Sequence, residues 1–137
     1  MKSFENKVAA ITGAGSGIGR ALALGLARQG CHLALADVNS AGLKETAELA
    51  RALGVKVSEA LVNVAERDAV QAWADQVMAQ YGQVNAIFNN AGVAQGGTVE
   101  GNDYADYEWV MSINFWGVVN GTKAFLPYLK SSGEGHI

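Results

Sequence analysis

The amino-acid sequence predicts an α/β fold with a doubly wound parallel sheet. Four short aliphatic runs alternate with longer stretches of helical period, which is the pattern of stacked strand–helix–strand units. A cluster of glycines follows directly after the first apolar run. Half of the 137 residues are hydrophobic and 17% are charged, a balance that fits a packed core and excludes a disordered chain. We therefore expect residues 1–137 to form a single domain.

Each predicted element has its own signal in the sequence. The first apolar run lacks polar alternation, as expected for a central parallel strand with both faces covered. Apolar residues spaced by three and four then predict a helix, and Asn39 or Ser40 offers an N-cap for the next helix. The expected elements are a strand over 8–12, a helix ending at Gly30, a strand over 32–36, a helix ending at Gly54, a strand within 55–64, a helix from about Glu66 to Gly82, and a strand over 86–88.

One long helix is expected near the end of the chain, because apolar residues keep helical spacing from Val110 to Leu129. Pro127 should bend its final turns. Right-handed crossovers then give the strand order 3-2-1-4. Residues 133–136 are typical of a turn, and Ile137 looks like the first residue of a fifth strand. We therefore expect the remainder of the sheet to be missing, and the fourth strand to leave backbone groups unpaired.

The segment Thr12 to Gly19, TGAGSGIG, joins the first strand to the first helix. A helix N-terminus presents unpaired N–H groups and about half a positive charge, which suits a pyrophosphate, and glycine has no Cβ to obstruct a phosphate. The alternative is that the glycines only permit a tight turn. Neither GxGxxG nor a P-loop motif is present. The segment matches TGxxxGxG through Thr12, Gly13, Gly17 and Gly19, and in this the chain resembles the short-chain dehydrogenase/reductase family.

The resemblance implies a Rossmann-type domain and an oxidoreductase that transfers a hydride between a nicotinamide cofactor and an alcohol or ketone. Asp37 follows the glycine loop by about 20 residues, where a dinucleotide-binding fold places the acid that receives the ribose hydroxyls. The alternative is a helix cap or turn residue. A carboxylate there would repel a 2′-phosphate, and Ser16, Val38 and Asn39 add no compensating cation. NAD is therefore expected in preference to NADP.

Residues 89–92, NNAG, extend the resemblance to the family's strand-four signature. By that resemblance, Asn89 ties neighbouring strands together, and Asn90, Ala91 and Gly92 lie against the cofactor.

Asn114 resembles the helix asparagine of the family's catalytic tetrad, which holds a water in a proton relay. The alternative is an inward polar residue that bonds backbone at a helix irregularity.

After the third strand, Asn63 and Val64 stand where the family usually has Asp and a small hydrophobe. Asn63 can still accept a hydrogen bond from adenine, without charge assistance.

The expected site has one candidate catalytic residue, Asn114. The expected cofactor-binding residues are Thr12, Gly13, Gly15, Ser16, Gly17, Ile18, Gly19, Asp37, Val38, Asn63, Val64, Asn90, Ala91 and Gly92.

The resemblance also implies a catalytic serine, a tyrosine, and a lysine four residues after the tyrosine. None of Tyr81, Tyr104, Tyr107 and Tyr128 has that lysine. We therefore expect an NAD-dependent oxidoreductase fragment that is inactive by itself, because its acid/base residues lie in a missing C-terminal half. The alternative is a non-catalytic nucleotide-binding or interaction module that is complete at 137 residues.

Composition and charge exclude several other functions. The net charge of −3 and the lack of a basic cluster argue against a nucleic-acid partner. The sequence has no apolar segment that is long and uninterrupted enough to suggest a membrane span. Cys31 is the only cysteine, which suits a reducing compartment such as the cytoplasm. Neither His32 nor His136 belongs to a sequence spacing typical of metal ligands, so no metal site is expected.

Two expectations concern the last helix. Asp103, Asp106 and Glu108 are interpreted as favourable charge near its N-terminus. An apolar stripe bearing Val118, Phe125 and Leu129 would lack neighbours in a truncated domain, so we expect the chain to form a homo-oligomer through it.

Overall fold

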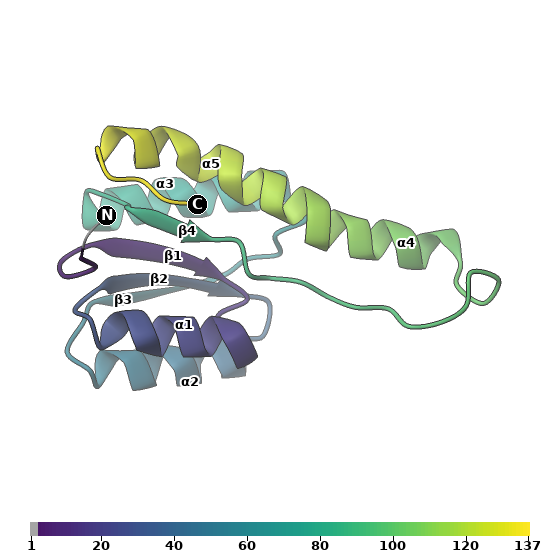
Figure 1. Cartoon of the computed structure of the whole chain (residues 1–137), viewed down its shortest axis with the longest axis horizontal. Helices are drawn as coiled ribbons and strands as arrows, with labels where there is room; N and C mark the ends of the chain where they lie inside the picture. The colour runs from purple at the N-terminus through teal and green to yellow at the C-terminus, as the bar shows by residue number, and fades with distance from the viewer. Residues whose placement is uncertain (1–2) are drawn as a thin grey trace.

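The computed structural model describes residues 3–137 as a four-stranded parallel sheet covered by helices on both faces (Figure 1). The strand order β3-β2-β1-β4 confirms the prediction. In chain order the elements are β1 (Val8–Thr12), α1 (Gly17–Ala27), β2 (His32–Asp37), α2 (Ser40–Arg51), β3 (Val57–Leu61), α3 (Arg67–Tyr81), β4 (Ala86–Phe88), α4 (Tyr104–Met111), the π-helical segment η1 (Ser112–Trp116) and α5 (Gly117–Ser131).

β1 lies at the centre of the sheet and pairs in parallel with β2 on one side and β4 on the other. All five of its residues are buried, which explains why this run has no polar alternation. Alternate residues serve two cores: Ala9 and Ile11 pack under α1 and α2, whereas Val8 and Ala10 pack under α3 and α5. The sheet thus separates two apolar layers.

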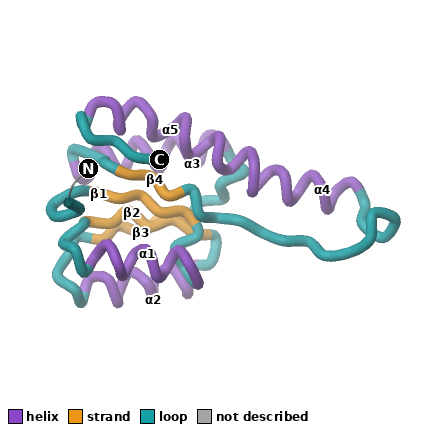
Figure 2. The backbone as a smooth tube through the Cα atoms, in the orientation of Figure 1, coloured by secondary structure: helices purple, strands orange, loops and turns teal. Residues whose placement is uncertain are grey.

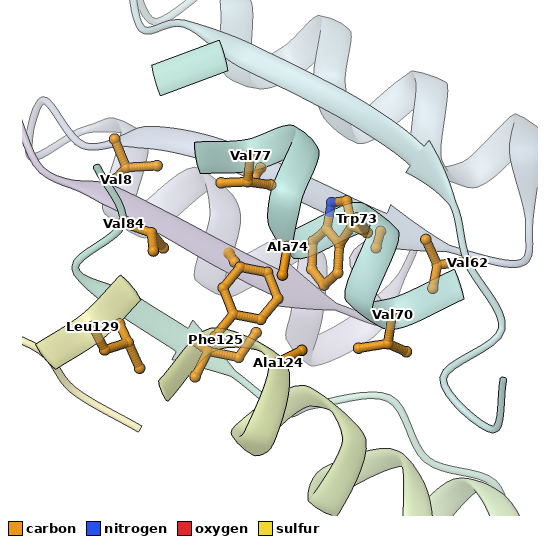
Figure 3. Packing of buried hydrophobic residues seen from close by; sticks show 14 of the residues in the cluster. Val8, Val62, Val70, Trp73, Ala74, Val77, Val84, Ala124, Phe125 and Leu129 are labelled. Atoms are coloured by element: carbon orange, nitrogen blue, oxygen red, sulfur yellow. The ribbon is translucent and has the colours of Figure 1, made fainter. Parts of the chain in front are cut away.

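The core beneath α3 and α5 is built around two aromatic rings (Figure 3). Trp73 and Phe125 meet edge to face, with ring centroids 4.9 Å apart. Phe125 is fully buried and Leu129 is 3% exposed. We had expected these two residues to lie on an exposed apolar stripe through which the chain associates, and that expectation was wrong. Helical periodicity identifies an apolar face, but α3 and the sheet already cover this one.

The predicted long helix is a rod of three segments, α4, η1 and α5, and α5 continues through Pro127 to Ser131. The loop over residues 89–103 runs out from β4, and the chain returns along α4, so α4 projects beyond the sheet (Figure 2). Asp103 and Asp106 form a capping box at the start of α4, which agrees with their interpretation as N-terminal charges.

The outer edge of β4 is partly paired. His136 forms a parallel bridge with Ala86, donating its N–H to Asn85 O at 2.9 Å and accepting from Ile87 N at 3.1 Å. The expectation of an unpaired β4 edge was wrong at this point. The bridge lies one residue before Ile137, which had been predicted to start the fifth strand.

The buried aromatic pair generates a prediction about stability. Phe125→Ala should lower the free energy of unfolding by about 3–5 kcal/mol, because it removes a buried ring and leaves a cavity against Trp73. The neighbouring Leu126, which is 36% exposed, supplies the control, and Leu126→Ala should cost less than about 1 kcal/mol. Urea denaturation measures both, and equal losses in the two variants would contradict the assignment of Phe125 to the core.

Candidate functional site

A cleft of about 360 Å³ opens where the four strands end, at their carboxyl ends. Open parallel sheets characteristically bind ligands at this position. Each strand contributes the residues that follow it, and η1 contributes Ile113. The lining consists of Gly13, Ser16, Gly17, Ile18, Asp37, Val38, Val62, Asn63, Val64, Asn90, Ala91, Gly92, Val93 and Ile113.

The structure brings most of the candidate residues together around this cleft. Thr12, Gly15 and Gly19 do not line it but are buried directly behind the lining. Sequence reasoning missed Val62, Val93 and Ile113. Each is an immediate neighbour of a residue that had been singled out, and that adjacency was the one available signal.

The N-terminus of α1 faces this cleft without a side-chain cap. Ser16 is the N-cap residue, but its hydroxyl makes no capping hydrogen bond, and the first turn contains no acid. The first N–H groups of a helix have no partner within the helix. The exposed end of α1 therefore presents hydrogen-bond donors and partial positive charge to whatever enters the cleft.

The glycines of the loop are required mainly by the loop's own packing. A Cβ on Gly13 would lie 2.9 Å from Ala91 Cα, and one on Gly15 would lie 2.9 Å from Asp37 Oδ2. A Cβ on Gly19 would collide with the carbonyl oxygen of Gly13. Gly17 differs, since it has a φ of +50° and its Cβ would meet open space. Only Gly17 thus combines an unusual backbone conformation with free space at the cleft.

Asp37 ends β2 at the rim of the cleft and uses both carboxylate oxygens. Oδ2 accepts from the N–H of Gly15 at 2.7 Å, and Oδ1 accepts from the N–H of Asn39 at 2.9 Å. Asn39 caps α2 through Gly42, so Asp37 is not the helix cap that the sequence left open. These two hydrogen bonds fix the direction of the carboxylate.

Three hydrogen bonds join the glycine loop to the segment that follows β4. The Thr12 hydroxyl accepts from the N–H groups of Asn90 and Ala91, each at 3.0 Å, and Asn90 Nδ2 donates to the carbonyl of Thr12 at 3.0 Å. The tie between neighbouring strands was expected from Asn89. Instead, Asn89 Nδ2 donates to Thr122 Oγ1 on α5 at 3.1 Å, and Asn90 joins the strands. The expectation for Asn89 was wrong because its side chain turns toward the helix.

The wall that follows β3 is held by α5. Val64 lies in the lining, and its carbonyl accepts a hydrogen bond from the buried Asn120 Nδ2 at 2.9 Å. Gly117 packs so tightly against Val64 that a Cβ would lie 2.6 Å from the valine Cγ2. The exposed Asn63 closes its own turn by accepting from the N–H of Ala65 at 3.0 Å.

Asn114 lies in the π-helical segment η1, beside the cleft. Its Oδ1 accepts from the N–H of Val93 at 2.8 Å, and its Nδ2 donates to the carbonyl of Val93 at 2.8 Å. This is the alternative that the sequence left open, a polar side chain bonded to backbone at a helix irregularity. Asn114 therefore holds the segment that follows NNAG against the helix.

The tyrosine and cysteine side chains lie away from the cleft. None of the four tyrosines, all within the described part of the chain, is among the lining residues. Burial raises the pKa of Tyr81, whose hydroxyl donates to Leu33 O, and the hydrogen bond to Asp75 raises the pKa of Tyr128. Burial also raises the pKa of the Cys31 thiol to about 11. The raised pKa values move these two phenols and the thiol further from ionisation at neutral pH.

Within residues 3–137, no three His, Cys, Asp or Glu side chains gather closely enough to hold a metal ion. None of the helices described there is both long and apolar enough to span a bilayer.

Comparison with known proteins places this geometry in context. Over 137 residues, the chain is 56% identical to SadH of Mycobacterium tuberculosis, which is named as an oxidoreductase, and the match covers all of this chain and 50% of SadH. A short chain dehydrogenase/reductase from Burkholderia phymatum, solved in complex with NAD, has a TM-score of 0.94 and 41% identity over 98% of this chain and 48% of that one. An alcohol dehydrogenase from Thermococcus sibiricus, complexed with 5-hydroxy-NADP, has a TM-score of 0.89 and 34% identity over 95% of this chain and 56% of that one.

These matches agree on the fold and on the family. The chain spans about half the length of each of these three proteins. A family model described as short chain dehydrogenase matches residues 7–137, which is nearly the whole chain. The chain therefore belongs to the short-chain dehydrogenase/reductase family.

Proposed function

We propose that this chain is the NAD-binding portion of an enzyme that transfers a hydride between the nicotinamide and an alcohol or ketone. One observation carries the proposal: a single cleft joins the uncapped N-terminus of α1 to the carboxylate of Asp37. The first suits a pyrophosphate, and the second suits the hydroxyls of a ribose. The resemblance to a Burkholderia structure that contains NAD supports the same assignment.

The residues around the cleft fit such a cofactor. The end of α1 would hold the pyrophosphate beside Ser16 and Gly17, where open space adjoins the backbone. Ile18 and Val38 line the cleft, yet their side chains are 74% and 71% exposed. A bound dinucleotide would cover apolar surface that otherwise faces water.

The remaining lining residues would hold the two ends of the cofactor. Asn63 and Val64 would contact the adenine, whereas Asn90, Ala91 and Gly92 would lie against the other half of the dinucleotide. Neither Thr12 nor Asn114 lines the cleft. Thr12 would hold Asn90 in place through its hydrogen bonds, and Asn114 would hold Val93 in the same way. We propose them, with Gly15 and Gly19, as supports of the binding residues.

We propose that NAD is preferred over NADP. The family alone does not decide this point, because one similar structure holds NAD and another holds 5-hydroxy-NADP. The decision rests on Asp37, whose negative charge would repel a 2′-phosphate. In the sequence, neither Val38 nor Asn39 after it supplies a compensating cation.

Bound NAD would supply the hydride acceptor, but oxidising an alcohol also requires a base that removes the hydroxyl proton. An amide such as that of Asn114 neither accepts nor releases a proton usefully near neutral pH. We propose that the acid/base group of the whole protein lies outside these 137 residues. In the whole protein, Asn114 would still hold a water of the proton relay.

For the whole protein we also propose a reducing compartment such as the cytoplasm, since Cys31 is the one cysteine here.

We also propose that the chain self-associates through the α4 and η1 segments of the rod, in place of the expected stripe of Val118, Phe125 and Leu129. α4 has no buried residue, and Trp109, Phe115 and Trp116 are 45%, 49% and 50% exposed. The two ends of the rod differ in charge, since Asp106 and Glu108 lie in α4 whereas Lys123 and Lys130 lie in α5. A second copy packed antiparallel would cover the aromatic rings and pair each acidic end with a basic one.

Asp37 provides the test of cofactor binding and choice. The unmodified chain should bind NAD more tightly than NADP in calorimetric titrations. Asp37→Ala should weaken the binding of NAD by roughly ten- to a hundredfold, because it removes charge-assisted hydrogen bonds to the ribose. The difference in affinity between NAD and NADP should therefore become smaller. Asp68→Ala, which removes an exposed acid in the first turn of α3, should change neither affinity. No binding of NAD by the unmodified chain would refute the assignment.

The chain by itself should show no dehydrogenase or reductase turnover. General acid/base catalysis typically contributes roughly 10²- to 10⁴-fold, and no candidate acid or base lines the cleft apart from Asp37 at its ribose end. The measurement follows NADH absorbance with a panel of alcohols and ketones at micromolar protein. Reproducible turnover that Asn114→Ala abolishes would place the active site within this chain and overturn the proposal.

Light scattering tests the proposed association. The average mass of the unmodified chain should rise with concentration, and 1 M salt should weaken the association by screening the charged ends. Replacing both Trp109 and Phe115 by serine should yield a monomer, whereas the control Leu53→Ser removes an apolar side chain, 42% exposed, beyond α2 and should not. A monomeric unmodified chain across a wide concentration range would rule out this surface as an interface.

A further inference from the structure

Arg20, in the first turn of α1, ties the glycine loop to α2. Its Nη2 donates to the carbonyl of Gly15 at 2.8 Å and to Glu45 Oε2 at 2.7 Å, and lies 3.4 Å from the carbonyl of Gly42. Its Nε donates to Thr46 Oγ1 at 2.9 Å. The planar guanidinium holds its Nε and Nη2 donors in fixed relative directions, which the rotatable ammonium of a lysine does not. The family motif and the cleft lining leave this residue without a role.

Gly15 is held from both sides as a result. Its N–H donates to Asp37 Oδ2 at 2.7 Å, while its carbonyl accepts from Arg20. α2 approaches the same carbonyl closely, because a Cβ on Gly42 would lie 2.6 Å from the carbonyl oxygen of Gly15. Gly15 thus connects the guanidinium directly to one oxygen of the carboxylate, whereas the route to the other oxygen is longer and passes through Gly42 and Asn39. Freeing its carbonyl would also loosen one of the two anchors of Asp37.

We propose that Arg20 is a positioning residue for cofactor choice: by fixing Gly15 it sets the direction of the Asp37 carboxylate, and so the preference for NAD over NADP. This inference rests on the proposed function. A bound ribose gains most from a carboxylate that is already aimed at it, because no ordering is then needed on binding. Arg20 does not line the cleft and would contact no part of the cofactor.

The positioning role and a purely electrostatic role predict opposite changes in the NAD preference when Arg20 is removed. If Arg20 acted merely as a nearby cation, its removal would weaken NADP more than NAD, because NADP carries the additional phosphate. The NAD preference would then rise. If Arg20 positions Asp37, its removal weakens NAD more, and the preference falls. Arg20→Lys separates the two further, since it keeps the charge but loses the planar guanidinium.

The experiment titrates NAD and NADP into the unmodified chain, Arg20→Gln, Arg20→Lys and Asp37→Ala, and into the Arg20→Gln/Asp37→Ala double variant. Arg20→Gln should lower the ratio of NAD to NADP affinity about tenfold, and Arg20→Lys should lower it in the same direction. In the Asp37→Ala background, Arg20→Gln should leave the ratio unchanged, because no carboxylate remains to be aimed. Partial unfolding cannot imitate this result, since it reduces the binding of both ligands equally.

A matched control and a measurement without ligand complete the design. Arg51→Gln removes an equivalent ion pair at the far end of α2, where Arg51 Nη2 lies 2.7 Å from Glu59 Oε2, and should leave the ratio unchanged. Hydrogen exchange at the Gly15 amide should accelerate in Arg20→Gln but not in Arg51→Gln. An unchanged or increased NAD preference in Arg20→Gln, or an equal fall in the Asp37→Ala background, would overturn the inference while leaving NAD binding intact. Failure of the unmodified chain to bind either dinucleotide would overturn the proposed function itself.

Discussion

The turn from β1 into α1 is packed so closely against its surroundings that three of its glycines have no room for a side chain. Gly13 lies against the segment after β4, Gly15 against Asp37 at the end of β2, and Gly19 against the loop itself. The carboxyl ends of three strands therefore meet at a single turn. Because the turn is fixed from three sides, the N-terminus of α1 and the carboxylate of Asp37 keep a constant relation, which recognition of one long ligand requires.

The second organising element is the helical rod, because it supports two distant parts of the cleft. Asn120 in α5 holds the wall after β3, and Asn114 in η1 holds the segment after β4. An uninterrupted α-helix advances a side chain by 100° per residue, so a π-helical segment changes the direction that the residues before it face. The irregularity at residues 112–116 coincides with Asn114, which makes two hydrogen bonds to one residue of the loop.

The sequence was sufficient to predict the strand order, the glycine loop and the position of Asp37, since these have local signals: apolar runs, glycine spacing and the end of a strand. What it could not predict depends on contacts between distant segments. The burial of Phe125 depends on α3, and the turn of Asn89 toward Thr122 depends on how α5 packs. Val62 and Ile113 join the cleft only because two segments about fifty residues apart meet there. Periodicity identifies a face of a helix but not the element that covers it.

The two hydrogen bonds already made by Asp37 also bear on cofactor choice. A carboxylate has about four acceptor positions, and the N–H groups of Gly15 and Asn39 occupy two of them. The two that remain match the two hydroxyl donors of an unmodified ribose. A 2′-phosphate would remove one donor and bring further negative charge to a carboxylate that has no freedom to turn away, because both of its oxygens are anchored. Under the proposed function, the anchoring of Asp37 by the protein would make its discrimination against a 2′-phosphate stronger than the charge of a mobile side chain would.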